Sequence, residues 1–149
     1  FGKSAGAAGS VTVSSRTWIE LILNRARSFI YSTAPMPSQA AAALAGLRLI
    51  KGKLGEERRG TLHRNIDHLC NELQIPRPQG AIIPLIIGDE LHALKIAENL
   101  QREGILAPAI RYPTVSKGSA RIRITVSANH SEKDIAFLVK KIKKSLNNI

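Results

Sequence analysis

Acidic residues, aromatic residues and long apolar runs are all scarce in this sequence. Asp and Glu contribute 11 of 149 residues against 22 Lys and Arg, so the formal net charge is +11. This imbalance favours anionic partners, which are nucleic acid, anionic lipid, or ligands that carry phosphate or carboxylate groups. Aromatic residues make up only 4% of the chain, so we expect an aliphatic core. No run approaches the ~20 apolar residues of a membrane-spanning helix.

Cysteine is nearly absent as well. Cys70 is the single cysteine, which excludes a disulfide within the chain. A lone cysteine fits a reducing compartment, and the first residues have neither the basic region nor the long apolar region of a signal peptide. We therefore expect a cytoplasmic protein that is not attached to a membrane.

The apolar residues that are present recur at intervals that alternate between helical and strand spacing. The pattern predicts helices over 18–27, from Pro37 through SQAAAALAGLRLI, over 56–73, over 91–100 ending at Gly104, and after Ser131. It predicts strands or β-prone runs over 10–15, 29–31, 81–87, 106–111 and 121–127. Pro84 inside the 81–87 run indicates an edge strand or a bulge. The interleaving predicts an α/β or α+β fold.

The segment RIRITVS, residues 121–127, alternates strictly between apolar and polar residues. Arg121 and Arg123 therefore share one face of the predicted strand, opposite Ile122 and Ile124. Arginine suits bidentate capture of a carboxylate or phosphate. Without further context, an exposed polar face on an edge strand is the favoured explanation of the pattern.

Three other motifs have simple structural explanations. Residues GKS, 2–4, fit a glycine-rich loop better than a P-loop, because AGAAGS is a poor start for the helix that must follow a P-loop directly, and the position of the earlier P-loop glycine lies outside the given sequence. The run KKIKK, residues 140–144, fits the solvated face of an amphipathic helix, because Ile142 continues the buried stripe. His63 and His68 lie five residues apart, which does not fit a zinc site on one helix, so no metal site is expected. Lys3, among small residues, suits either a solvated loop or an amine nucleophile that a planar cofactor can approach.

Four stretches together resemble one enzyme family. They are FGK with its glycine-rich continuation, FIYSTAPMPSQA, AIIPLIIGD and AIRYPTVSKGSARIRITVSANHS, in this order. The whole chain resembles the α-oxoamine synthases, which are fold-type I, pyridoxal-phosphate-dependent acyltransferases. The resemblance implies an α/β fold in which residues 1–36 end a large cofactor-binding domain and residues 37–149 form a linking helix and a small C-terminal domain.

The resemblance also implies roles for individual residues. Lys3 is expected to be the Schiff-base lysine for pyridoxal 5'-phosphate and to transfer the substrate's proton. Ser32 and Thr33 match a segment that reaches the cofactor phosphate of a partner subunit. Arg123 matches the arginine that binds the amino-acid carboxylate, and Arg111 and Thr114 match positions on the acyl side of the pocket. The residues that stack on the ring and pair with its nitrogen precede the lysine in this family, so the chain alone is expected to be inactive.

The implied reaction condenses an L-amino acid with an acyl thioester and releases carbon dioxide. The match favours alanine and a pimeloyl thioester of coenzyme A or of an acidic acyl carrier protein, as in biotin synthesis, in a homodimer with its active site at the interface. The alternative within the family is glycine C-acetyltransferase or another sister enzyme. The alternative of another class is a non-catalytic basic domain that binds anions. Nucleic-acid binding is not expected, since aromatic and motif support is lacking.

Overall fold

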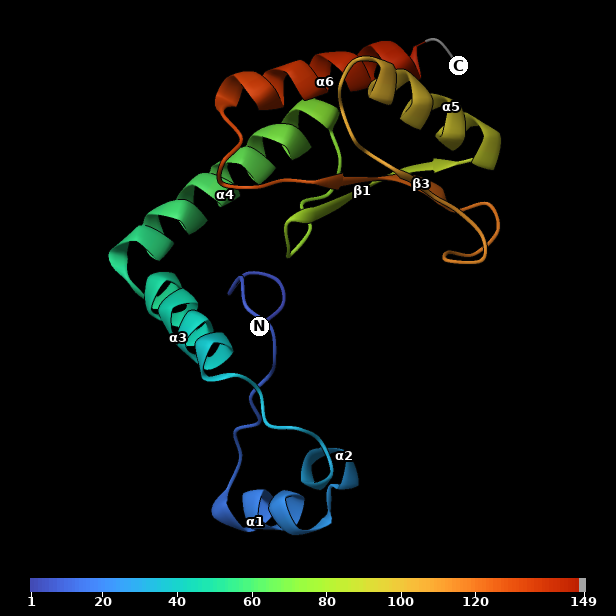
Figure 1. Ribbon diagram of the computed structural model, residues 1–149. Coiled ribbons are helices and arrows are strands. Elements are labelled where there is room, and N and C mark those ends of the chain that lie inside the picture. Colours follow the sequence, from blue (N-terminus) through green and yellow to red (C-terminus); the bar gives the residue numbers. More distant parts are fainter. Residues whose placement is uncertain (148–149) are drawn as a thin grey trace. The chain divides into compact units, whose positions relative to one another are not determined.

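The computed structural model describes residues 1–147 and divides into two compact units, Phe1–Glu56 and Glu57–Ile149 (Figure 1). Each unit has its own contacts and is described by itself. The domain boundary expected between residues 36 and 37 refers to a longer enzyme and stays a prediction. The last two residues of the expected second domain lie outside the described residues.

The first unit is helical. It contains α1 (Arg16–Arg25), α2 (Arg27–Ile30), α3 (Pro37–Lys51) and the first turn of α4 (Lys53–Leu73). The helices predicted from residue 18 and from Pro37 are confirmed, and Pro37 occupies the first turn of α3. Pro37 fits that position because the first backbone N–H groups of a helix have no partner within the helix.

Two β-prone runs of the first unit are not strands. Residues 10–15 form no strand, and Val13 is 86% exposed. The predicted run at 29–31 is also wrong, because Phe29 and Ile30 belong to α2 and donate their backbone N–H groups to the Ala26 carbonyl at 3.0 and 2.9 Å. β-branched and aromatic residues favour a strand only where a neighbouring strand pairs with them, and none does so here.

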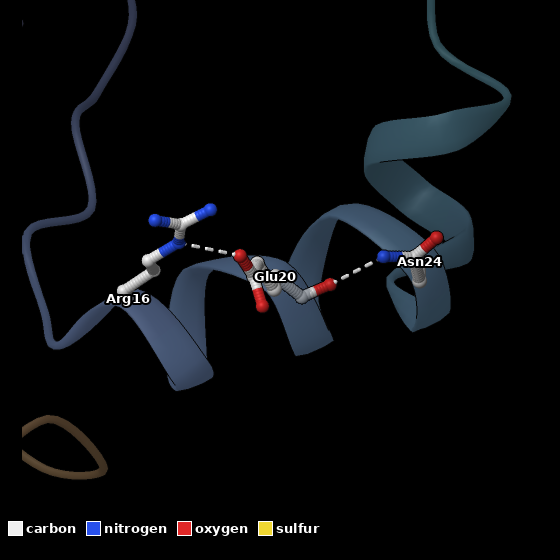
Figure 2. Close-up of polar contacts among 3 residues, drawn as sticks. All are labelled: Arg16, Glu20 and Asn24. Carbon is white, nitrogen blue, oxygen red and sulfur yellow. Dashed lines mark hydrogen bonds and ion pairs between the residues drawn. The ribbon is translucent and has the colours of Figure 1, made fainter.

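Helix α1 is held by polar contacts on its surface (Figure 2). The Arg16 Nε atom donates to Glu20 Oε1 at 2.8 Å, one turn along the helix. The side-chain amide of Asn24 donates to the backbone carbonyl of Glu20 at 2.7 Å. The described helix buries none of its residues, and Trp18 of the expected apolar stripe is 59% exposed. Its apolar side chains are therefore available to another surface.

The second unit has a three-stranded antiparallel sheet of β1 (Ile82–Gly88), β2 (Ala109–Ile110) and β3 (Ala120–Thr125), in the order β1-β3-β2. β1 is an edge strand, as Pro84 predicted, and its register shifts between Ile86 and Gly88. The strand expected over 106–111 is only two residues long. β3 is central and buries Ile122 and Ile124, which confirms the predicted alternation.

Helices α4, α5 (Glu90–Arg102) and α6 (Glu132–Leu146) lie on one side of this sheet (Figure 1). They bury the aliphatic core expected from the composition, which consists mainly of Ile66, Leu69, Cys70, Ile83, Leu85, Ala93, Ile96, Leu100, Ile122, Ile124, Ile135, Val139 and Ile142. The opposite face of the sheet carries the outward residues of the strands, and among residues 57–147 no helix covers it (Figure 1).

Local signals begin and end the helices as expected. Ser131 and Asp134 form a reciprocal capping box at the start of α6, with the Asp134 N–H donating to Ser131 Oγ at 3.2 Å and the Ser131 N–H to Asp134 Oδ2 at 2.8 Å. Gly104 follows α5 with φ +80°, and the next N–H group, of Ile105, donates to the Leu100 carbonyl at 2.9 Å. Glycine suits this left-handed position because it has no Cβ.

Candidate functional site

Lys3 lies in an exposed turn at the start of the first unit. Its carbonyl accepts a hydrogen bond from the Gly6 N–H at 3.0 Å, and Gly6 has φ +63°, which other residues rarely adopt. A Cβ atom added to Gly2 or Gly6 would meet nothing within 4 Å. The exposed Lys3 thus has open space beside two neighbouring glycines, which a planar ligand could enter.

The loop that carries Lys3 is anchored to α3 by a backbone contact. A Cβ atom on Gly46 would lie 2.2 Å from the backbone oxygen of Ala5, far inside van der Waals contact. Ala7 is buried and donates its N–H to the Phe1 carbonyl at 3.3 Å. Of the small residues in SAGAAG, Ala5 is thus packed closely against a helix.

Ser32 and Thr33 follow the end of α2 and are exposed. The Ser32 hydroxyl donates to the backbone carbonyl of Ser28, which closes the short helix. Phosphate oxygens at neutral pH mainly accept hydrogen bonds, so Ser32 would have to turn its hydroxyl away from Ser28 to bind one. Thr33 is the next residue of the same exposed segment.

Arg123 is exposed on β3, on the face opposite Ile122 and Ile124. Its strand neighbour on β1 is Pro84, and its backbone N–H donates to the Pro108 carbonyl at 2.9 Å. The backbone of Arg123 is therefore held on both sides, by its pairing with β1 and by the hydrogen bond to Pro108. The guanidinium is presented from a central strand, which fixes its base more firmly than a loop would.

Arg111 and Thr114 lie in the turn that follows β2. The Thr114 N–H donates to the Arg111 carbonyl at 2.9 Å, and the Tyr112–Pro113 peptide bond within the turn is cis. Both residues line a cleft of about 360 Å³. Its other wall is α5, which contributes Leu94, Ala97, Glu98 and Gln101.

The expected site residues fall into two sets. Lys3, Ser32 and Thr33 belong to the first unit, whereas Arg111, Thr114 and Arg123 belong to the second. Within the second unit, the sheet register pairs Ile110 with Arg121, so the turn containing Arg111 leaves β2 directly beside the arginine face of β3. The contribution of α5 to the cleft was not anticipated from the sequence, because no local pattern marks which helix lies against a loop.

The sequence did not predict the buried side-chain amide of Asn65. Asn65 of α4 is 4% exposed and donates its side-chain N–H groups to the carbonyls of Ser127 and His130 at 3.3 and 2.8 Å. These bonds fix the loop that follows β3. In the sequence, the only sign of this contact is an asparagine within a helical pattern. Asparagine is common on helix surfaces, so its presence does not identify a buried amide.

Two of the four lysines of 140–144 form ion pairs with glutamates of other segments. Lys141 Nζ lies 2.6 Å from Glu103 Oε2, and Lys143 Nζ lies 2.9 Å from Glu72 Oε2. Hydrogen bonds from these lysines lower the pKa of both carboxyls. Three of the four lysines are exposed, which agrees with a solvated helix face.

Neither a metal-binding cluster nor a membrane-spanning helix lies within residues 1–147. No group of three or more His, Cys, Asp or Glu side chains in this part of the chain could hold a metal ion. No helix there combines the length and apolar character needed to cross a membrane.

Curated relatives cover most of this chain. The 8-amino-7-oxononanoate synthase of Bordetella petrii is 43% identical over 135 residues, which is 87% of this chain and 34% of the relative. The enzyme of the same name from Cupriavidus necator is 44% identical, over 93% of this chain and 36% of the relative. The chain thus spans about a third of the length of these relatives. Their name confirms the resemblance to α-oxoamine synthases.

Solved structures show the same fold. An 8-amino-7-oxononanoate synthase of Francisella tularensis matches with a TM-score of 0.82 and 24% identity, over 99% of this chain and 44% of that chain. The serine palmitoyltransferase of Sphingomonas wittichii matches with a TM-score of 0.88 and 23% identity, over 99% of this chain and 38% of that chain. The expected α/β fold class is confirmed. A family model for aminotransferase class I and II matches residues 1–142, and the chain belongs to that family.

Proposed function

We propose that this chain is part of a pyridoxal-phosphate-dependent enzyme that condenses L-alanine with a pimeloyl thioester to form 8-amino-7-oxononanoate, a step of biotin synthesis. The observation that carries the proposal is the identity of 40–44% with curated relatives of that name, which extends over 87–97% of this chain. We place this reaction in the cytoplasm.

The residues around Lys3 fit the proposed cofactor. A primary amine stands in an exposed turn with open space beside Gly2 and Gly6, as a planar aldehyde cofactor requires. When bound, pyridoxal phosphate withdraws electrons from the Cα atom of the amino acid. Lys3 would hold the cofactor through Nζ. As a neutral amine, Lys3 would then take the proton from the Cα atom of alanine, and it would return a proton after the condensation.

Arg123 would bind and orient the amino acid. Its guanidinium can take both carboxylate oxygens of alanine at once, which fixes the direction of the Cα–H bond. In the balanced reaction, a bond forms between the alanine Cα and the thioester carbonyl carbon. The carbonyl–sulfur bond and the bond from Cα to the carboxylate break, which releases the thiol and carbon dioxide.

The proposed enzyme is a homodimer in which Ser32 and Thr33 reach the cofactor phosphate of the partner subunit. Large apolar side chains near this segment support association, since Trp18, Phe29 and Tyr31 are all more than half exposed. Scattered single apolar residues are ordinary on surfaces, whereas a group of this size commonly marks an interface.

The full-length protein with pyridoxal phosphate offers a direct test. We expect a cofactor absorbance shift, and thiol release from pimeloyl-coenzyme A that is faster with alanine than with glycine. Faster turnover of glycine and acetyl-coenzyme A would instead identify a glycine C-acetyltransferase. A protein that binds no cofactor and releases no thiol would contradict the proposal and support a non-catalytic anion-binding domain.

A further inference from the structure

Strand β3 carries a second arginine that the proposed function does not use. Arg121 and Arg123 are two residues apart, so both side chains leave the same face of the sheet about 7 Å from one another along the strand. The described ion pairs include neither of them. Two guanidinium groups are therefore placed side by side without a carboxylate of this unit between them.

The position of Arg121 is better defined than that of an ordinary surface arginine. It is half-buried, and its Nε atom donates to the Ser119 carbonyl at 3.1 Å. This bond uses one of the five guanidinium N–H groups and fixes the direction of the plane. The terminal nitrogens keep the paired donors that match the two oxygens of a carboxylate.

The surroundings of Arg121 on this face are apolar. Its neighbour on β1 is Ile86, which is 54% exposed, and its neighbour on β2 is Ile110. A cation flanked by two isoleucines is complementary to a ligand with a methylene chain and a terminal anion. A free anion such as inorganic phosphate would gain nothing from the isoleucines.

The order of residues along β3 indicates how a ligand with a methylene chain and a terminal anion would be oriented. Arg123 is assigned to the carboxylate of alanine, and Arg121 lies one step nearer the turn that carries Arg111 and Thr114. A dicarboxylic acyl group, joined to the alanine Cα at one end, would extend its other end along the strand toward Arg121. A monocarboxylic acyl group of the same length would place a methyl group there.

We propose that Arg121 binds the distal carboxylate of the acyl donor and thereby selects dicarboxylic over monocarboxylic acyl thioesters. This inference rests on the proposed function, because it concerns the second substrate of the same reaction. It adds a specificity-determining residue to those that the resemblance implied.

The test compares two donors in the full-length holoenzyme with saturating alanine. Pimeloyl-coenzyme A and heptanoyl-coenzyme A share the carrier and the chain length, and only the first has a distal carboxylate. We expect the wild type to prefer pimeloyl-coenzyme A in kcat/KM. Arg121→Gln should lower that value ~10-fold or more for pimeloyl and less than ~2-fold for heptanoyl, since a charge-assisted bidentate bond is lost for one donor only. Arg121→Lys keeps the charge and should fall between.

Controls separate this effect from damage to the fold. Arg102→Gln removes an exposed cation at the end of α5, away from the sheet face, and should leave the donor preference unchanged. The KM for alanine should also stay within ~2-fold in Arg121→Gln. If that variant does not fold, Arg121→Lys carries the comparison, because loss of the bidentate geometry alone should reduce the preference.

Three results would overturn the inference while leaving the proposed function intact. They are equal activity of the wild type on both donors, an equal loss for both donors in the Arg121 variants, and no loss for either donor in those variants. Dependence on the phosphates of coenzyme A would give the second result, because both donors carry them. Absence of thiol release with every thioester would instead contradict the proposed function itself.

Discussion

Gly46 of α3 approaches Ala5 so closely that a Cβ atom at residue 46 would lie 2.2 Å from the Ala5 backbone oxygen. Ala5 is two residues after Lys3, so this contact sets where the lysine-bearing loop rests on the helix. The contact involves backbone on the loop side, which cannot move away by changing a rotamer. The position of the candidate nucleophile thus depends on a missing side chain more than forty residues away.

Gly46→Ala should therefore reduce cofactor loading although it is a favourable change for a helix. Gly to Ala normally stabilises a helix interior by up to ~1 kcal/mol, whereas overpacking of this kind costs ~1–3 kcal/mol. We expect the clash to prevail and to lower cofactor absorbance and kcat in the full-length enzyme. Gly80→Ala, where a Cβ meets nothing within 4 Å, is the matched control. Full cofactor loading in Gly46→Ala would refute the role of this contact.

Arg123→Ala should raise the KM for alanine and lower kcat/KM. The fall in kcat/KM should correspond to a loss of ~2–4 kcal/mol of transition-state stabilisation, because a charge-assisted bidentate bond to the substrate is lost. The side chain is exposed and its loss leaves no buried group unpaired, so stability should change little. Steady-state kinetics with alanine and a thermal melt check both parts. An unchanged kcat/KM for alanine would remove Arg123 from the site.

Ser32→Ala combined with Thr33→Val should weaken cofactor binding by ~1–3 kcal/mol if their hydroxyls bond a phosphate across a dimer interface. Cofactor titration of the full-length apoenzyme measures the change. Mixed dimers of this double variant with Lys3→Ala test the interface, because one site then combines Lys3 of the first chain with Ser32 and Thr33 of the second. Restored cofactor binding at that site is expected, whereas mixtures that stay as weak as the double variant alone would show that the two residues act within their own chain.

Asn65→Ala should destabilise the second unit by ~1–3 kcal/mol, because the carbonyls of Ser127 and His130 lose a buried donor. The affected loop follows β3, so amide exchange should accelerate first at residues 127–130. Asn65→Asp keeps the size but removes the donors and should be at least as harmful. Unchanged exchange in that loop would show that the amide does not hold it.

The capping box of α6 should respond to acid in a defined direction. The Ser131 backbone N–H and then its hydroxyl lower the pKa of Asp134 from its ordinary value of 3.8. A carboxyl whose pKa is lower in the folded protein adds stability above its unfolded pKa and loses it as the pH falls through the folded pKa. Asp134→Asn should thus accelerate amide exchange at the start of α6 at neutral pH, and the difference from the wild type should vanish in strong acid. A difference that is constant with pH would contradict the box.

Periodic burial made most of the second unit predictable. The alternation in 121–127, the stripes of α4 and α6 and the stop at Gly104 all arise because one face of each element meets a core while the other meets water. The capping box and Pro84 act through the backbone of nearby residues, so they too can be recognised locally. The first unit exposes its apolar side chains, and the same reasoning failed there for residues 10–15 and 29–31.

The sequence by itself determined the helices and strands of the second unit, the arginine face of β3 and, through four ordered motifs, the family. Local spacing suffices for the first two, because a residue's face depends only on the repeat of its own element. Only the tertiary structure decided that Gly46 meets Ala5, that Asn65 holds the loop after β3, and that α5 walls the cleft beside Arg111. These contacts join segments far apart in the chain, and their partners are set by how whole elements pack.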